Sequence, residues 1–418
     1  MILEAVVMQL LFVVVAISGL FYFMFSKRVF DFFSIAYISA CVYFLPGFYG
    51  HVGRQQQPLV DSAYLVMIMV LSLIFLGALF LNRSEKWNKK RYITIRGTNL
   101  VVVVAVLLGL IGFSMSLFEL GPSLFTNDKM LVRGELGKWY LLWIEGALLG
   151  LVLSYLQKRR SLFIISFLLI IVDFYIGFRT TLAIAVMSIF VSFLSEQGRI
   201  RFAIDNKKLC IYGFISGLFF FSYKGVYALV KLGRFDLVFN NLGNFQYYIG
   251  AIRASEPFTT QLILNEVIMN NFKVGIDHFT NVIYQLLIFA PQLGFQRKIG
   301  FDDFANELFP HATHGMASNI WAEMWSSGGW LLLTVFILFF VLIIYAGSKF
   351  LMRLKDSSMT ALLSIVMCYW TFYIHRNSFN YEINLIKRSI LFWIFCYIVS
   401  AVMTKLAVKN KPRADFHE

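Results

Sequence analysis

This chain of 418 residues is 59% hydrophobic and only 14% charged, with a mean hydropathy of +0.71. A soluble protein of this length could not keep so much apolar surface out of water. The composition therefore excludes a soluble enzyme and predicts an all-α polytopic membrane protein, because helices satisfy their own backbone hydrogen bonds in lipid.

Apolar runs alternate with short basic connectors along the chain. Each run is long enough, or nearly so, to cross a bilayer core of about 30 Å as a helix. We predict about eleven transmembrane helices in a single integral membrane domain covering residues 1–418. Two of the runs are short and nearly fused through Gly177-Phe178-Arg179. The runs are 5–25, 30–48, 61–81, 99–119, 138–156, 161–176, 180–195, 208–226, 329–346, 358–374 and 389–405.

The net charge of +14 lies on one side of this topology. Alternate connectors, beginning with Lys27 and Arg28, hold 22 of the 37 Lys and Arg residues and seven acidic residues, a net +15. The remaining Lys, Arg, Asp and Glu residues carry a net charge of −1. This asymmetry follows the positive-inside rule, so we expect no nucleic-acid partner. It predicts an N-terminus outside the cytoplasm and a cytoplasmic C-terminus.

The longest connector, 227–328, falls on the external side and is predicted to be a structured loop with short amphipathic helices. Apolar residues recur at helical spacing between Leu262 and Asn270. The apolar stretch 282–290 is too short to span, so it is expected at the interface or on the bundle. A large external loop favours a protein that covers a site at the membrane surface.

Arg179 stands where one apolar run turns into the next. A guanidinium at membrane depth costs about 2.5–3.5 kcal/mol on insertion scales, so it is normally retained with a partner. We interpret Arg179 as a bidentate ligand for a lipid-linked phosphate. The alternatives are a structural pair with Asp173 and snorkelling to the external surface.

Segment 375–388 opens between the last two predicted spans and is rich in amides, aromatic rings and cations. Sugars bind planar amides and aromatic faces, and pyrophosphate binds cations. For Lys387 and Arg388 the alternative is an interfacial anchor for the last helix. The candidate substrate-binding residues here are Arg376, Asn380, Tyr381, Lys387 and Arg388.

Candidate general bases precede the ninth span. His311 and His314 are three apart, and Asn319 and Glu323 follow four apart. No further close ligands complete a zinc site, so we predict no metal. His314 or Glu323 is therefore a candidate catalytic base for a sugar hydroxyl, although these side chains could also cap a helix. Glu145, in the middle of a span, is interpreted as structural, either protonated or paired; a proton path is the alternative.

Three stretches together resemble the O-antigen polymerase (Wzy) family. They are the Gly177-Phe178-Arg179 turn, the stretch from His314 through Asn319 and Glu323 to Gly328-Gly329, and Arg376-Asn377-Ser378-Phe379. Their order along the chain and their places in the topology carry the resemblance, together with one large external loop.

The resemblance implies a GT-C-like enzyme of the bacterial inner membrane that acts in lipopolysaccharide biosynthesis. Its substrate would be a glycan linked to undecaprenyl pyrophosphate, polymerised at the periplasmic face without a cofactor. Arg179 and Arg376, with Arg253 or Arg388, would neutralise the pyrophosphate in place of a metal, and His314 or Glu323 would activate the acceptor hydroxyl. Membrane lipid, a chain-length regulator and a flippase are the implied partners.

Three other functions remain open. A non-catalytic assembly partner should lack external arginines at helix ends, so Arg179 and Arg376 count against it. An O-antigen ligase usually has a shorter spacing than His314 to Gly328 and an Arg-x-x-x-Leu element that Arg376 does not match, which favours a polymerase. A flippase or polysaccharide exporter would show two similar halves and an ion path, and the sequence contains no such repeat.

Overall fold

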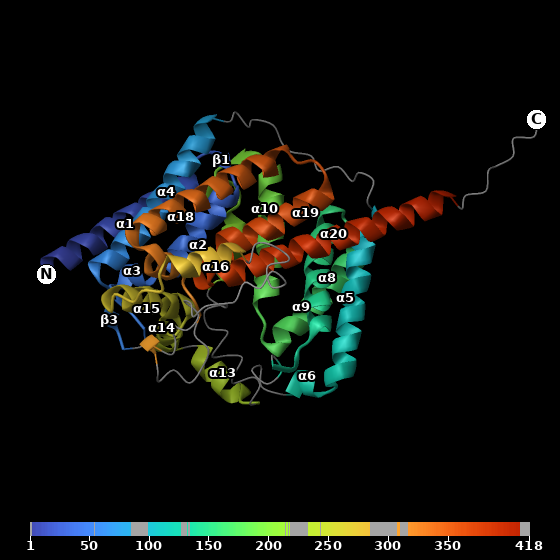
Figure 1. Cartoon of the computed structure of the whole chain (residues 1–418), viewed down its shortest axis with the longest axis horizontal. Helices are drawn as coiled ribbons and strands as arrows, with labels where there is room; N and C mark the ends of the chain where they lie inside the picture. Colours follow the sequence, from blue (N-terminus) through green and yellow to red (C-terminus); the bar gives the residue numbers. More distant parts are fainter. Residues whose placement is uncertain are drawn as a thin grey trace, which may run out of the picture. The chain divides into compact units, whose positions relative to one another are not determined.

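The computed structural model describes residues 2–53, 55–84, 99–126, 132, 134–213, 215, 217, 233–242, 244–284, 307–309 and 317–409. These residues are mainly helical (Figure 1). Two pairs of two-residue antiparallel strands accompany the helices. They are β1 (Arg28–Val29) with β4 (Arg199–Ile200), and β2 (His51–Val52) with β3 (Gln57–Pro58).

Seven helices in the described part of the chain are long and apolar enough to cross a membrane. This confirms the prediction of an all-α protein with several spans. The seven are α1 (Ile2–Phe25), α4 (Asp61–Ser84), α5 (Asn99–Leu120), α8 (Lys138–Leu156), α18 (Ile320–Arg353), α19 (Ser357–Cys368) with the turns that follow it, and α20 (Phe379–Lys409).

The apolar run 30–48 is not one helix, as predicted, but two. Helix α2 (Phe32–Tyr43) is followed by the single turn α3 (Pro46–Tyr49). Pro46 lacks an N–H and cannot continue α2, but it fits the first turn of a new helix. Most of the predicted span 208–226 lies outside the described residues, apart from its first residues.

Contacts divide the chain into two compact units. The first consists of Met1–Lys89, Gln197–Lys349 and Trp370–Ile383. The second consists of Lys90–Glu196, Phe350–Tyr369 and Asn384–Glu418. The single integral domain stays a prediction.

In the first unit, the loop predicted to be external packs on the N-terminal helices. Helix α15 (Glu256–Met269) contacts α2, α3, α4 and β2. The Asn265 side chain holds the β2–β3 hairpin, because it accepts from the Val60 N–H at 2.9 Å and donates to the Pro58 carbonyl at 3.2 Å. The other helices of the described loop are α13 (Phe235–Leu242), α14 (Phe245–Arg253) and α16 (Ile276–Tyr284).

Two glycines interrupt α18. Gly328 has φ −154° and ψ 21°, and Gly329 has φ 61° and ψ −155°. The second conformation belongs to a region that is essentially restricted to glycine. The interruption separates a buried first part of α18, residues 320–327, from the longer apolar part. The predicted span that began at 329 therefore starts one residue before the regular part of this helix resumes.

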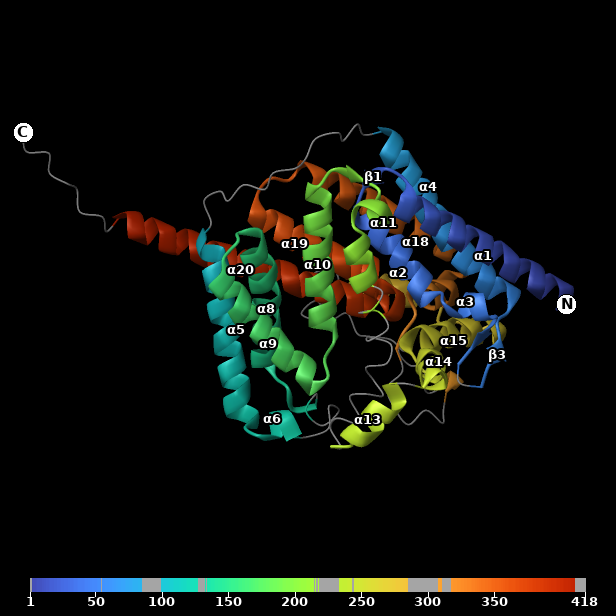
Figure 2. The same cartoon turned by 180° about the vertical axis from the view of Figure 1, so that it is seen from behind.

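In the second unit, α8 packs against α5, α9 (Arg160–Ile176), α10 (Thr180–Glu196) and α19. Figure 2 shows α5, α8 and α9 side by side. A Cβ atom added to Gly146 would lie 2.5 Å from the Gly109 backbone nitrogen and 2.7 Å from the Ala105 carbonyl oxygen. Small residues let transmembrane helices approach this closely.

We expect Gly146→Ala to lower the stability of the second unit by about 1–3 kcal/mol, because its methyl group meets backbone atoms that cannot move aside. The midpoint of thermal unfolding in detergent measures this loss. Gly250→Ala is the matched control, because an added Cβ there meets nothing within 4 Å. Equal midpoints for the two variants would contradict the close packing of α5 and α8.

Candidate functional site

The first part of α18 begins at Asn319, which caps the helix. The Asn319 Oδ1 atom accepts from the backbone N–H groups of Trp321 at 3.0 Å and Ala322 at 3.1 Å. Its Nδ2 atom donates to the Thr260 carbonyl at 2.9 Å. An asparagine in this position satisfies helix donors that otherwise lack partners. Asn319 is thus a structural residue that joins α18 to α15.

One helical turn later, the Glu323 carboxylate is completely buried and bonded through both oxygens. Its Oε2 atom accepts from the Phe379 backbone N–H at 2.6 Å. Its Oε1 atom lies 2.7 Å from His278 Nε2, on α16. The His278 side chain is 11% exposed, whereas that of Glu323 is 0% exposed. The pair therefore reaches the surface through the imidazole.

Three hydrogen bonds join the start of α18 and Ser318, which precedes it, to residues 375–379 at the start of α20. The Ser318 N–H donates to the Arg376 carbonyl at 2.9 Å. The Trp321 indole N–H donates to His375 Nδ1 at 3.2 Å. The third is the bond between Glu323 and Phe379. The structure thus brings together two of the three stretches that the sequence singled out.

Arg376 lies at the end of an irregular helical segment. Helix α19 is followed by a π-helical turn, Tyr369–Tyr373, and a 3₁₀ turn, Ile374–Arg376, and such turns are frequent at functional sites. The guanidinium forms an ion pair with Glu256, the first residue of α15, and lies 5.0 Å from the centre of the Tyr373 ring. Both partners of the ion pair are partly exposed, at 24% and 29%.

A second buried carboxylate lies beside this segment. The Glu382 side chain is 0% exposed, and its Oε2 atom accepts from Asn377 Nδ2 at 2.7 Å. Asn380 and the half-exposed Tyr381 lie in the same first turn of α20. The predicted residues Glu323, Arg376, Asn380 and Tyr381 therefore occupy one compact unit.

Arg253 ends α14 in the same unit. Partial burial lowers the pKa of His51, and the positive charge of Arg253 lowers it further. Protonation of His51 is disfavoured because it would place a charge in a partly buried site, beside the guanidinium of Arg253. Arg253 therefore contributes positive charge next to β2.

The remaining predicted residues belong to the second unit or lie outside the described residues. Arg179 follows Gly177, which ends α9 with φ 115°, and its carbonyl accepts from the Ala183 N–H as α10 begins. Asp173, the alternative partner for Arg179, accepts from the Tyr140 hydroxyl at 2.7 Å. Lys387 and Arg388 are also in the second unit. His314 lies outside the described residues.

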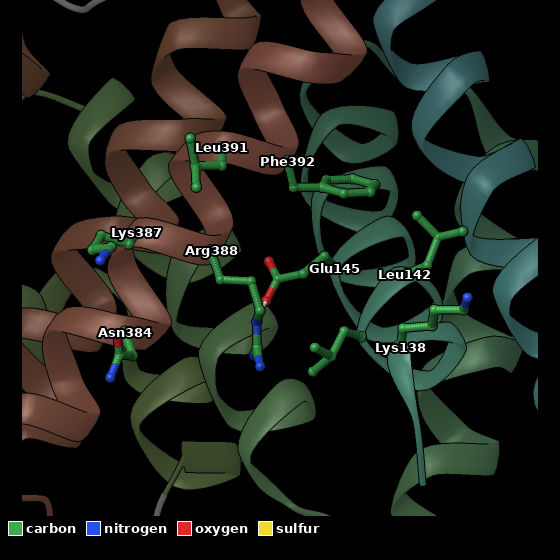
Figure 3. Close-up of a pocket in the computed structure, with 9 residues that line it drawn as sticks. Lys138, Leu142, Glu145, Asn384, Lys387, Arg388, Leu391 and Phe392 are labelled. Atoms are coloured by element: carbon green, nitrogen blue, oxygen red, sulfur yellow. Dashed lines mark hydrogen bonds and ion pairs between the residues drawn. The ribbon is translucent and has the colours of Figure 1, made fainter. Parts of the chain in front are cut away.

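Arg388 binds the mid-span Glu145. Its Nε atom lies 2.5 Å from Glu145 Oε1, and the Ser389 hydroxyl donates to Glu145 Oε2 at 2.8 Å. The sequence left open whether Glu145 is protonated, paired or part of a proton path, and the structure shows it paired. A cavity of about 420 Å³ adjoins this pair (Figure 3).

Two residues of the first-unit site, His278 and Glu256, were missed as functional candidates from the sequence. The partner of His278, Glu323, lies 45 residues away, and Glu256 lies 120 residues from Arg376. No local pattern could reveal these partners.

Among the described residues, no group of three or more His, Cys, Asp and Glu side chains could hold a metal ion. Comparison with protein families, with curated proteins and with solved structures finds no match to this chain.

We expect Glu323→Ala to lower the free energy of unfolding by about 3 kcal/mol, because the buried Phe379 N–H and His278 both lose their acceptor. Glu323→Gln keeps a carbonyl oxygen for Phe379 and should cost less than half as much. Thermal unfolding in detergent compares the two variants. Equal losses would contradict the role of the carboxylate oxygens.

Proposed function

We propose that this protein polymerises oligosaccharide repeat units carried on undecaprenyl pyrophosphate, by metal-independent glycosyl transfer at the periplasmic face of a bacterial inner membrane. The observation that carries the proposal is the bond between Glu323 and His278, which lies beside the Arg376 segment. It pairs a positioned base with a cation in one unit, as glycosyl transfer from a pyrophosphate requires.

His278 is the general base in this proposal, and Glu323 positions it. The Phe379 N–H donates to Glu323 Oε2, and Glu323 Oε1 lies 2.7 Å from His278 Nε2. In the proposed mechanism Nε2 donates to Glu323, which leaves the lone pair of Nδ1 to take the proton. This differs from the expectation that Glu323 or His314 is itself the base. His314 stays a candidate from the resemblance alone.

The bond changes of the reaction balance as follows. The acceptor hydroxyl oxygen forms a bond to the anomeric carbon of the growing glycan, and the bond from that carbon to the pyrophosphate oxygen breaks. The hydroxyl proton goes to His278 Nδ1. The lipid pyrophosphate leaves with the electron pair, and the Arg376 guanidinium stabilises its charge. Arg179, Arg253 and Arg388 are the further cations that the resemblance assigns to this role.

The proposal includes a GT-C-like arrangement of about eleven spans with a periplasmic N-terminus and a cytoplasmic C-terminus. Seven long apolar helices support a multi-pass protein. The one-sided distribution of Lys and Arg supports the orientation. Both arguments concern topology, so they bear on where the reaction would occur.

Reconstitution with purified lipid-linked repeat unit tests this function. The wild type should produce a ladder of products that EDTA leaves intact. Arg179→Ala and Arg376→Ala should abolish the ladder. His278→Asn should lower kcat by about 10²–10⁴-fold, the usual contribution of a general base.

Thr280→Ala is the matched control for His278→Asn, because Thr280 lies on the same helix, α16, and is exposed. It should leave kcat unchanged. Normal ladders from both arginine variants would overturn the function. A normal kcat for His278→Asn with inactive arginine variants would overturn only the assignment of the base.

Glu256 forms an ion pair with the Arg376 guanidinium, which the pyrophosphate must reach in this proposal. We expect Glu256→Gln to lower KM for the lipid-linked donor by roughly threefold to tenfold, because the substrate no longer displaces a carboxylate. Glu266→Gln is the control, since Glu266 lies on the same helix and bonds Asn270. A KM that rises in Glu256→Gln would contradict competition for Arg376.

A further inference from the structure

An exposed cation of the first unit stands on the same part of the loop as His278, and the proposed mechanism does not use it. Lys273 belongs to the turn between α15 and α16, five residues before His278. Its Nζ atom lies 3.4 Å from the centre of the Trp325 ring, in the buried first part of α18. That part of α18 also carries Glu323, so the lysine and the histidine contact the same helical segment.

The backbone that follows Lys273 is fixed on α18. The N–H groups of Val274 and Gly275 both donate to the Ser326 carbonyl, at 3.1 and 3.4 Å. In an unbroken helix this carbonyl would accept from the N–H of residue 330, and the glycine break of α18 lies between those two positions. The turn that presents Lys273 is therefore attached beside Trp325.

The Lys273 ammonium contacts an aromatic ring and no acid. Lys273 forms no ion pair with another described residue, Asp277 of the same loop included. A tryptophan face attracts a cation but leaves its charge in place. Trp325 is 7% exposed, and its buried indole N–H has no partner among the described residues. Two donors at this place thus lack an acceptor within the part of the chain that the structure describes.

The ligand that suits this place is an oxyanion. Partial burial lowers the pKa of the Lys273 ammonium, because loss of water disfavours its charged form, and a neighbouring negative charge would oppose this effect. Phosphate and carboxylate oxygens form strong, charge-assisted hydrogen bonds with an ammonium group. Arg376 is already paired with Glu256, whereas an anion that reaches Lys273 displaces only the contact with the ring.

We propose that Lys273 binds an oxyanion of the lipid-linked substrate, on the loop that also supplies the base His278. This role rests on the proposed polymerisation, which brings such a substrate to the loop. The oxyanion is either the pyrophosphate of the lipid carrier or the carboxylate of an acidic sugar in the glycan, and both offer the same chemistry to an ammonium group. Trp325 holds the ammonium in place until the substrate arrives.

Native mass spectrometry of the full-length protein in detergent tests the proposal. The two probes are sugar-free undecaprenyl pyrophosphate and the purified lipid-linked repeat unit. Lys273→Gln should bind at least one probe about tenfold more weakly than the wild type, because hydrogen bonds to charged groups contribute that much. Lys273→Arg keeps the charge and also lies favourably over an aromatic ring, so its binding should stay within about threefold of the wild type.

Lys138→Gln is the matched control. Lys138 is exposed and also lies over a tryptophan, with Nζ 5.3 Å from the centre of the Trp139 ring, but it belongs to the second unit. This variant should bind both probes as the wild type does. Undecaprenol, the same hydrocarbon chain without a phosphate, should bind equally to the wild type and to Lys273→Gln.

The two probes separate the two sources of the oxyanion. Weaker binding of the sugar-free carrier by Lys273→Gln would identify the pyrophosphate, and weaker binding of the repeat unit alone would identify an acidic sugar. Equal binding of both probes by the wild type and Lys273→Gln would overturn the role of Lys273, as would an equal loss in Lys273→Arg. The proposed function fails by a different result, namely a wild type that produces no ladder.

Discussion

Burying a carboxylate in a helical membrane protein is unfavourable unless hydrogen-bond donors surround it, and this constraint governs the first unit. Glu323 meets it with two partners from distant parts of the chain, the donating Phe379 backbone N–H on α20 and the His278 ring on α16. The carboxylate thereby joins the long loop 227–328 to the segment that carries Arg376. In the proposed function the same bonds serve structure and chemistry, because Glu323 also orients the imidazole.

The backbone around Glu323 departs from regular helix on both sides of the site. Gly328 and Gly329 interrupt α18 five and six residues after the carboxylate. A π-helical turn and a 3₁₀ turn precede the strand-like Asn377. A continuous helix pairs its backbone N–H and C=O groups internally, whereas such departures leave some of them without an intrahelical partner. These groups need other partners when they are buried. The bonds from Ser318 to Arg376 and from Phe379 to Glu323 meet that need.

In the second unit, an arginine compensates the buried carboxylate. Glu145 is 3% exposed and binds Arg388 and Ser389, both on α20. Removing Arg388 would leave the buried Glu145 carboxylate without its cation, which is far more costly than the pair. Next to Glu145, the backbones of α5 and α8 approach closely at Gly146 and Gly109.

The sequence by itself determined the class of the protein, because the lengths of apolar runs and the placement of Lys and Arg are local properties that lipid and membrane potential act on directly. It also singled out Glu323 and Arg376, since ionisable residues next to spans are costly to retain. Only the tertiary structure decided their partners. His278, Glu256 and the pairing of Glu145 with Arg388 join residues 45 to 243 positions apart. Packing between helices selects such pairs, and no periodicity along the chain records it.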